Sequence, residues 1–317
     1  MKTLISCLRG RRHILRREPC EDRFAVLPLP GGLAAAAADG HGDARCCRAG
    51  FGARVACASA LHALSDPALS PEELAGAIRQ RYERLCRRHL ARHPLTEREQ
   101  ALLADLDPLY AYGTTLVCAR TDAAGTTLLR IGDSEVLALG SDGLPFPILA
   151  ADPNCTGSAT TSLADPDAET AARVARYDRP AAALLLFTDG YSYRGQLPAG
   201  LLDLLRAPLP DAIPAELLDQ GDHGDDQTVL LAADEALCAG EGFRQGLTEL
   251  LDRLAAAEAL RKLQRERREV MAYLRLAQKA LRERQGEDLR SLCCHTREQL
   301  DRLQALDAEI AALSAAS

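Results

Sequence analysis

Residues 31–42 read Gly-Gly-Leu-Ala-Ala-Ala-Ala-Ala-Asp-Gly-His-Gly. The apolar run 33–38 follows a second apolar run, 24–29, and the segment Pro30-Gly31-Gly32 between them is typical of a turn that joins two strands. An acidic loop, residues 39–42, begins where the second strand is expected to end. A fold can therefore bring Asp39 beside acids from other strand ends.

Three further acidic clusters occupy similar places. They are Glu21-Asp22, Asp189-Gly190 after the apolar residues 184–187, and Asp225-Asp226 just before residues 228–231. Carboxylates and backbone carbonyls suit Mg²⁺ or Mn²⁺, whereas zinc and copper prefer His or Cys. An Asp that bridges two ions needs small neighbours, and a following glycine supplies an unhindered carbonyl, as in Asp39-Gly40. We therefore predict a hard-metal site built from these clusters.

The other patterns predict an α+β fold with sheets packed under helices. Apolar spacing and a Ser-Pro-Glu-Glu start predict helices over 49–64 and 70–92. Strands are expected at 112–119, 126–131 and 135–139 as an antiparallel meander, and at 181–188 and 228–232 as buried strands. Residues 150–180, rich in Asp, Ala, Pro and Thr, are expected to be the least ordered part.

The composition changes near residues 239–240. From 243 to 284, apolar residues recur at intervals of three, four and seven residues, and Glu, Arg, Lys and Gln lie between them. This spacing predicts a long amphipathic helix. Residues 285–288 interrupt it, with Asp288 as a candidate cap, and a second stripe runs from Leu289 to Leu313. We expect a helical hairpin over 240–317 whose apolar stripe packs within the hairpin, on the body or on another chain.

Composition and charge narrow the class of protein. The chain has 317 residues, 47% of them apolar, and a net charge of −7. Residues 1–239 hold 24 basic and 32 acidic residues, a net of −8, which disfavours nucleic acid as a partner. Eleven cysteines without CxxC spacing indicate reduced thiols. Since no secretory signal or membrane-spanning stretch is evident, we expect a cytoplasmic protein that does not contact membranes.

Six short motifs, in order and spacing, resemble those of type 2C metal-dependent protein phosphatases, in the compact bacterial branch of that family. The motifs are Arg17-Glu18-Pro19-Cys20-Glu21-Asp22, Ala38-Asp39-Gly40-His41-Gly42, Gly113-Thr114-Thr115-Leu116, Ile131-Gly132-Asp133-Ser134, Phe187-Thr188-Asp189-Gly190 and Asp225-Asp226-Gln227-Thr228. Gly10, His13 and the segment Asn154-Cys155-Thr156 add to the likeness. The resemblance covers roughly residues 10–235. It implies a catalytic domain over 1–237, folded as a four-layer sandwich of two antiparallel β-sheets flanked by helices.

The resemblance also implies roles for single residues. By motif position, Asp39 would bridge two ions, Gly40 would offer its carbonyl, Asp189 and Asp225 would bind the first ion, Glu21 and Asp22 the second, and Asp133 a third, looser one. His41 stands where the family has a proposed general acid, and an ordinary pKa near 6.5 suits that task. Arg17 stands where a guanidinium grips the substrate phosphate, with Arg16 as the substitute.

The expected function is hydrolysis of phosphoserine and phosphothreonine in proteins by direct attack of a water that two Mn²⁺ or Mg²⁺ ions activate. A phosphoprotein substrate and a cognate Ser/Thr kinase would be its partners. The alternative is a catalytically weak regulatory module that binds a partner or self-associates through residues 240–317. Ser141-Asp142-Gly143 and the lone His13 and His223 are interpreted as structural.

Overall fold

A computed structural model describes residues 1–155, 159–191, 197–218, 224–283 and 289–316. Thr156, His223 and the expected helix break at 285–288, with Asp288, lie outside these residues. The chain forms two compact units, residues 1–247 and residues 248–317, which are described separately.

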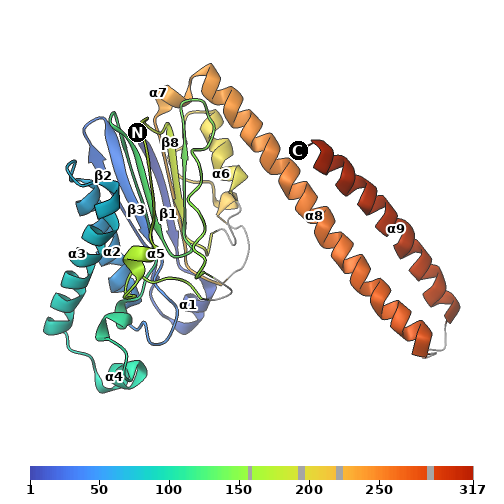
Figure 1. Cartoon of the computed structure of the whole chain (residues 1–317), viewed down its shortest axis with the longest axis horizontal. Coiled ribbons are helices and arrows are strands. Elements are labelled where there is room, and N and C mark those ends of the chain that lie inside the picture. The colour runs from blue at the N-terminus through green and yellow to red at the C-terminus, as the bar shows by residue number, and fades with distance from the viewer. Residues whose placement is uncertain (156–158, 192–196, 219–223, 284–288, 317) are drawn as a thin grey trace. The chain divides into compact units, whose positions relative to one another are not determined.

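The first unit contains two antiparallel sheets (Figure 1). The four-stranded sheet has the order β1 (Lys2–Leu8), β9 (Gln227–Ala233), β8 (Ala183–Phe187) and β6 (Glu135–Leu139). The five-stranded sheet has the order β2 (Arg23–Leu29), β3 (Gly32–Ala38), β4 (Leu116–Asp122), β5 (Gly125–Ile131) and β7 (Arg173–Tyr177). The predicted α+β fold with two antiparallel sheets is confirmed.

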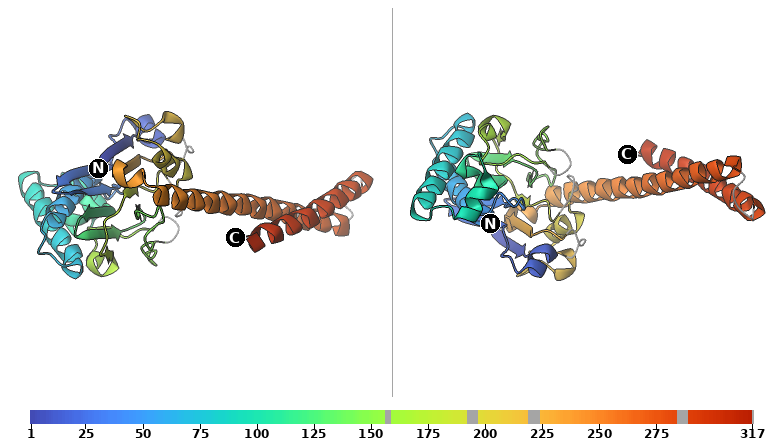
Figure 2. Two further views of the ribbon diagram at one scale, coloured as in Figure 1. Left: turned by 90° about the horizontal axis from the view of Figure 1, so that it is seen from above. Right: turned by 90° about the horizontal axis from the view of Figure 1, so that it is seen from below.

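Helices flank the sheets on both sides. The helix α2 (Ala49–Leu64) packs on β2, β3 and β4, and α3 (Pro71–Arg92) packs on α2. Figure 1 shows α6 on the opposite side, and Figure 2 shows the same arrangement from two further directions. The remaining short helices are α1 (Arg11–Arg16), α4 (Glu97–Leu103), α5 (Ala168–Ala171), α6 (Ala199–Asp203), α7 (Glu235–Cys238) and the 3₁₀ turns η1 (Pro108–Tyr112), η2 (Leu204–Arg206) and η3 (Ala215–Leu217).

The alanine run of β3 lies between two apolar layers. Side chains alternate along a strand, so Leu33, Ala35 and Ala37 pack toward the four-stranded sheet while the other alanines pack toward α2. Every residue from 33 to 38 is at most 3% exposed. Because these side chains are small, both neighbouring layers lie close to the backbone of β3.

One expectation about the sheets is wrong. Residues 135–139 do form a strand, but β6 pairs with β8 in the four-stranded sheet, so it does not continue a meander from β5. The chain changes sheet after Gly132, whose φ of +91° is a conformation that glycine adopts readily. The second neighbour of β5 is β7, a strand inside the segment 150–180 that the sequence suggested was least ordered.

The turn at residues 141–143 is structural, as expected. The helix α8 (Glu241–Glu283) begins against it, and Phe243 and Leu247 in the first turns of α8 are fully buried. A side chain on Gly143 would collide with the carbonyl of Phe243, and one on Gly246 with the carbonyl of Asp142. The first unit therefore includes the start of α8.

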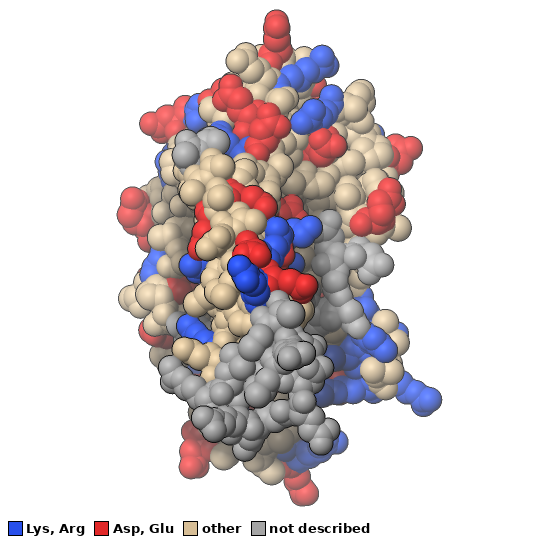
Figure 3. Space-filling model, turned by 90° about the vertical axis from the view of Figure 1, so that its right-hand side faces the viewer, with Lys and Arg blue, Asp and Glu red and all other residues tan. Residues whose placement is uncertain are grey.

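In the second unit, the rest of α8 pairs with α9 (Leu289–Ala316) in antiparallel fashion. Arg302 bonds Glu266 at 2.8 Å and Arg267 bonds Asp307 at 2.5 Å. The side chains of Ala277 and Leu306 are buried. Acidic and basic side chains are interspersed over the described part of the face in Figure 3. Among the described helices, none has the length and apolar character that crossing a membrane requires.

Candidate functional site

Acidic residues converge at one end of the two sheets. Asp39 follows β3, Asp133 follows β5, Asp189 follows β8 and Asp225 precedes β9. In the five-stranded sheet, Ala37 pairs with Val117 and Leu116 pairs with Ile131. In the four-stranded sheet, Phe187 pairs with both Glu135 and Val229. Within each sheet these strand ends therefore lie side by side. Carboxylates separated by up to about two hundred residues are thereby brought together.

A cavity of about 770 Å³ opens at this end of the sheets. Its lining includes six of the nine predicted site residues, namely Asp39, Gly40, His41, Asp133, Asp189 and Asp225. The other three, Arg17, Glu21 and Asp22, do not line it. Its polar lining also includes Arg12, Asp43, Arg45, Tyr110, Thr115, Thr160, Ser162 and Asp165.

Backbone hydrogen bonds fix Asp39 in this position. Its carbonyl accepts from the backbone N–H of Thr115 at 2.8 Å and from the hydroxyl of Thr114 at 2.7 Å. Its own N–H donates to Oγ1 of Thr115 at 3.2 Å. Thr114 and Thr115 of the Gly113-Thr114-Thr115 motif therefore fix the backbone of Asp39 through hydrogen bonds.

The carboxyl group of Asp39 lies within hydrogen-bonding reach of Asp189. Burial and the neighbouring carboxylates of Asp22 and Asp189 raise the pKa of Asp39 well above its usual range. Burial also raises the pKa of Asp189. Several acids thus share one small volume, an arrangement that positive charge would stabilise.

Asp22 lies behind Asp39 and is fully buried. Its Oδ2 accepts a hydrogen bond from Oγ1 of Thr188 at 2.8 Å, while its Oδ1 is buried without a partner. Burial raises the pKa of Asp22 to about 8. A buried carboxylate oxygen without a partner is costly, so this atom is a natural position for a cation or a solvent molecule.

Glu21 lies against Gly40, where an added Cβ would come within 2.8 Å of the Cβ of Glu21. Only glycine leaves room here, which keeps the backbone of Asp39-Gly40 close to Glu21. Burial raises the pKa of Glu21 to about 7, while nearby His13 acts in the opposite direction.

A supporting network around Asp226 was not predicted. The Asp226 carboxylate accepts from the backbone N–H of Gly10 at 2.7 Å and of Glu21 at 2.5 Å, and lies 2.9 Å from Nδ1 of His13. Although burial opposes it, hydrogen bonds from Gly10 and His13 lower the pKa of Asp226. Gly10 and His13 stand out in the sequence, but nothing local links them to a residue more than two hundred positions away.

The arginines of α1 are arranged differently from the expectation. Arg17, the predicted phosphate ligand, is the left-handed residue that ends α1, with φ of 59°, and is exposed outside the cavity lining. Arg16 is also exposed, and its Nη1 lies 4.0 Å from Glu18. Arg12 lines the cavity instead and pairs with Asp225 through Nη2 and Oδ2.

His41 lies at the cavity wall. Its backbone N–H donates to the carbonyl of Gly113 at 3.1 Å, and its Nε2 is buried without a partner. Burial lowers the pKa of His41, against the attraction of Asp133. His41 therefore combines a place in the cavity lining with a ring nitrogen that has no hydrogen-bond partner.

The donor set fits hard divalent cations. No three His, Cys, Asp or Glu side chains in the described part of the chain already surround a point that could hold an ion. Still, crowded carboxylates with raised pKa values, an unpartnered oxygen on Asp22 and a glycine beside Asp39 suit a cation with oxygen ligands. Arg12, which pairs with Asp225, supplies part of the positive charge that offsets these carboxylates.

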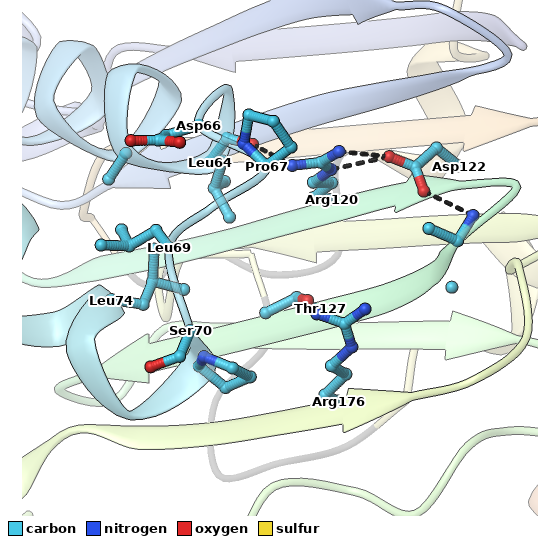
Figure 4. A pocket seen from close by; sticks show the side chains of 14 residues that line it. Leu64, Asp66, Pro67, Leu69, Ser70, Leu74, Arg120, Asp122, Thr127 and Arg176 are labelled. Carbon is cyan, nitrogen blue, oxygen red and sulfur yellow. Dashed lines mark hydrogen bonds and ion pairs between the residues drawn. The ribbon is translucent and has the colours of Figure 1, made fainter.

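A second, smaller cavity of about 100 Å³ lies at the opposite end of β4 (Figure 4). Arg120 there bonds the carboxylate of Asp122 at 2.7 Å and the carbonyl of Leu64 at 2.9 Å. None of the predicted site residues lines this cavity. The acidic cavity is therefore the candidate site.

Residues 9–266 match the family model described as Protein phosphatase 2C. The chain belongs to this family. It is a phosphatase, and the predicted family is confirmed. Comparison with curated protein sequences gives no match.

Solved structures similar to this phosphatase include three with low sequence identity. A bacterial serine phosphatase is 16% identical, with a TM-score of 0.48, and the match covers 74% of this chain and 97% of that one. The catalytic domain of the serine/threonine phosphatase PstP, in complex with two manganese ions, is 19% identical, with a TM-score of 0.48 and coverage of 73% and 97%. A sex-determining protein of C. elegans is 17% identical, with a TM-score of 0.49 and coverage of 75% and 66%.

Proposed function

We propose that this phosphatase is a divalent-cation-dependent hydrolase of phosphoserine and phosphothreonine in proteins. The observation that carries the proposal is the convergence of Asp39, Asp189 and Asp225 on one cavity, with Asp22 buried behind them. Family membership supports the reaction class.

Asp39, Asp189 and Asp225 would hold one Mn²⁺ or Mg²⁺ ion, and Asp39, the carbonyl of Gly40, Glu21 and Asp22 a second. Asp133 would serve a looser third position. Bound there, the ions would supply the Lewis acidity that lowers the pKa of water and offsets charge on a phosphate group. The acids alone would repel a phosphate dianion, so substrate binding depends on added positive charge.

The chain's own residues would position the substrate. Arg12 reaches the cavity from α1, and its planar guanidinium can donate two parallel hydrogen bonds to phosphate oxygens. His41 lines the cavity, and its Nε2, which has no hydrogen-bond partner, would donate a proton to the seryl or threonyl oxygen that leaves. We therefore propose Arg12 as the phosphate ligand, in place of Arg17, to which the family resemblance gave that role.

The test is hydrolysis of p-nitrophenyl phosphate and of a phosphoserine peptide by the full chain with Mn²⁺. Activity that EDTA removes and that Asp39→Asn abolishes is expected. A folded protein that binds Mn²⁺ in calorimetry yet hydrolyses neither substrate would overturn the proposal in favour of the regulatory module. That alternative has less support, because four of the six predicted carboxylates line one cavity and the chain belongs to a phosphatase family.

The hairpin over 248–317 is proposed as a surface for self-association or for a partner protein. Its paired helices carry exposed Leu276 and Leu300. A cognate kinase remains the expected partner of the reaction. Light scattering of the full chain tests self-association.

A further inference from the structure

Two thiols lie next to each other directly before the acidic motif. Sγ of Cys7, on β1, is 3.7 Å from Sγ of Cys20, in the loop that precedes Glu21 and Asp22. Both residues are half-buried. Each thiol is also 3.8 Å from the carbonyl oxygen of Asp22. The cysteine pair therefore touches the segment that carries two of the proposed metal ligands.

We propose that Cys7 and Cys20 form a reversible disulfide under peroxide and that this bond switches the phosphatase off. A disulfide has an S–S length near 2.05 Å, so the two sulfurs need to approach by roughly 1.7 Å, which side-chain rotation and a small loop movement can supply. The effect on activity rests on the proposed function, whereas formation of the bond does not.

The chemistry balances with hydrogen peroxide as the oxidant. One thiolate attacks the peroxide O–O bond and becomes a sulfenic acid, with release of hydroxide that takes up a proton to form water. The second thiolate then attacks that sulfur, the S–S bond forms, and the S–O oxygen leaves as a second water. Two thiols lose two electrons and two protons, and one peroxide is reduced to two waters. A dithiol such as dithiothreitol reverses the reaction by exchange.

The movement would fall on the loop, because β1 is fixed. All seven residues of β1 pair with β9. Residues 18–22 of the loop have no strand partner. Individual hydrogen bonds hold them instead: Nη1 of Arg23 donates to the carbonyls of Cys20 at 2.6 Å and Asp22 at 2.5 Å, and the N–H of Glu21 donates to Asp226 at 2.5 Å. Drawing Cys20 toward β1 strains these bonds and displaces Glu21 and Asp22 from Asp39. Disturbing groups that orient metal ligands typically costs about tenfold to a hundredfold in metal affinity or activity.

The other described cysteines give internal controls. Cys57, Cys86 and Cys118 are buried in the core, where peroxide has poor access. Cys47 is exposed and hydrogen bonds Glu99 at 3.6 Å. Cys47→Ser therefore removes an exposed thiol without touching the pair.

The first experiment detects the bond itself. The full chain is treated with hydrogen peroxide, quenched, digested with trypsin without reduction and analysed by mass spectrometry. A disulfide would join peptides 3–9 and 18–23, which trypsin releases by cleavage after Lys2, Arg9, Arg17 and Arg23. After peroxide treatment we expect this cross-linked pair both in the natural sequence and in the control variant Cys47→Ser, and we expect it to disappear after dithiothreitol. Absence of the cross-link in the natural sequence overturns the proposal.

The second experiment measures the consequence. Oxidised protein is expected to bind Mn²⁺ roughly tenfold more weakly in calorimetry and to lose hydrolysis of p-nitrophenyl phosphate by a similar factor, with recovery in dithiothreitol. Cys7→Ser and Cys20→Ser should lose the dithiothreitol-reversible part, while Cys47→Ser keeps it. A cross-link that changes neither Mn²⁺ affinity nor activity overturns the switch. If the protein proves inactive under all conditions, the proposed function fails. The cross-link and the Mn²⁺ affinity then still show whether the disulfide forms and whether it weakens metal binding.

Discussion

Arg12 forms an ion pair with Asp225, joining the short helix α1 to the loop that precedes β9. This pair places a guanidinium on one of the carboxylates proposed to bind a cation. A bound ion would replace Arg12 as the partner of Asp225 and leave its donors free for phosphate oxygens. Metal binding and phosphate binding are therefore expected to support each other.

Replacing Arg12 tests this assignment against a matched neighbour. Arg12→Ala should lower kcat/KM for a phosphoserine peptide about tenfold to a hundredfold, because one or two charge-assisted hydrogen bonds are lost. Arg17→Ala should remain close to the natural protein, since Arg17 lies outside the cavity lining. Steady-state kinetics in saturating Mn²⁺ measures both. The opposite ranking would restore the role that the family resemblance gave to Arg17.

Asp39→Asn should abolish cation-dependent activity without unfolding the protein. The carbonyl and N–H of Asp39 hold the backbone, and they are unchanged by the substitution. Mn²⁺ at about a hundred times its dissociation constant should stabilise the natural protein by about 2.7 kcal/mol, whereas the variant should gain much less. Thermal unfolding with and without Mn²⁺ provides the measurement. An equal Mn²⁺-dependent rise in Tm for both proteins would show that Asp39 is not a ligand.

Acidity should stabilise the metal-free protein. The pKa of Asp22 is raised to about 8 and that of Glu21 to about 7, so the folded state keeps protons that the unfolded chain releases near pH 4. The folded state binds more protons between about pH 4 and 8, and its stability therefore falls as the pH rises through this window. The Tm measured in EDTA should drop from pH 5 to pH 8, with a shallower drop for Asp22→Asn. A Tm that rises over this range would contradict the burial of these acids.

The boundary of the catalytic unit can be tested by truncation. A chain that ends after Leu247 keeps Phe243 and Leu247, which are fully buried, while a chain that ends after Ala239 loses both. Loss of a buried Phe alone costs about 3–5 kcal/mol, so the shorter chain should unfold at a clearly lower urea concentration. Equal urea midpoints would place the boundary at the predicted residues 237–240. Light scattering on the longer truncation shows whether self-association depends on residues 248–317.

Local patterns were enough to predict much of the fold. The helix α3 begins at the predicted cap, where Ser70 and Glu73 bond each other's backbone N–H groups at 3.4 Å and 3.1 Å. The sheet to which β6 belongs was not predictable in this way, because its partner β8 lies about fifty residues further along the chain. The strand β7 was missed because its side chains are only partly buried, so no apolar run marks it.

The candidate site, too, could be predicted from the sequence only in part. Acids at strand ends were predicted to lie together, and Asp39, Asp189 and Asp225 among them line the cavity. Asp133, which also lines it, was implied by the family resemblance. The family resemblance pointed to Arg17, whereas Arg12 lines the cavity and Arg17 forms the left-handed turn that ends α1. The contact between His13 and Asp226 depends on how α1 meets the loop before β9. Such contacts follow from the folded chain and have no local signature.

The alanines of β3 have a consequence for how this phosphatase tolerates change. Ala35 and Ala37 separate the two sheets, and Ala36 and Ala38 separate the strand from α2. A valine or leucine at any of them would wedge these layers apart and carry Asp39 with the strand, away from Asp189. Substitutions that look conservative would thus behave as active-site mutations, although none of these alanines reaches the cavity.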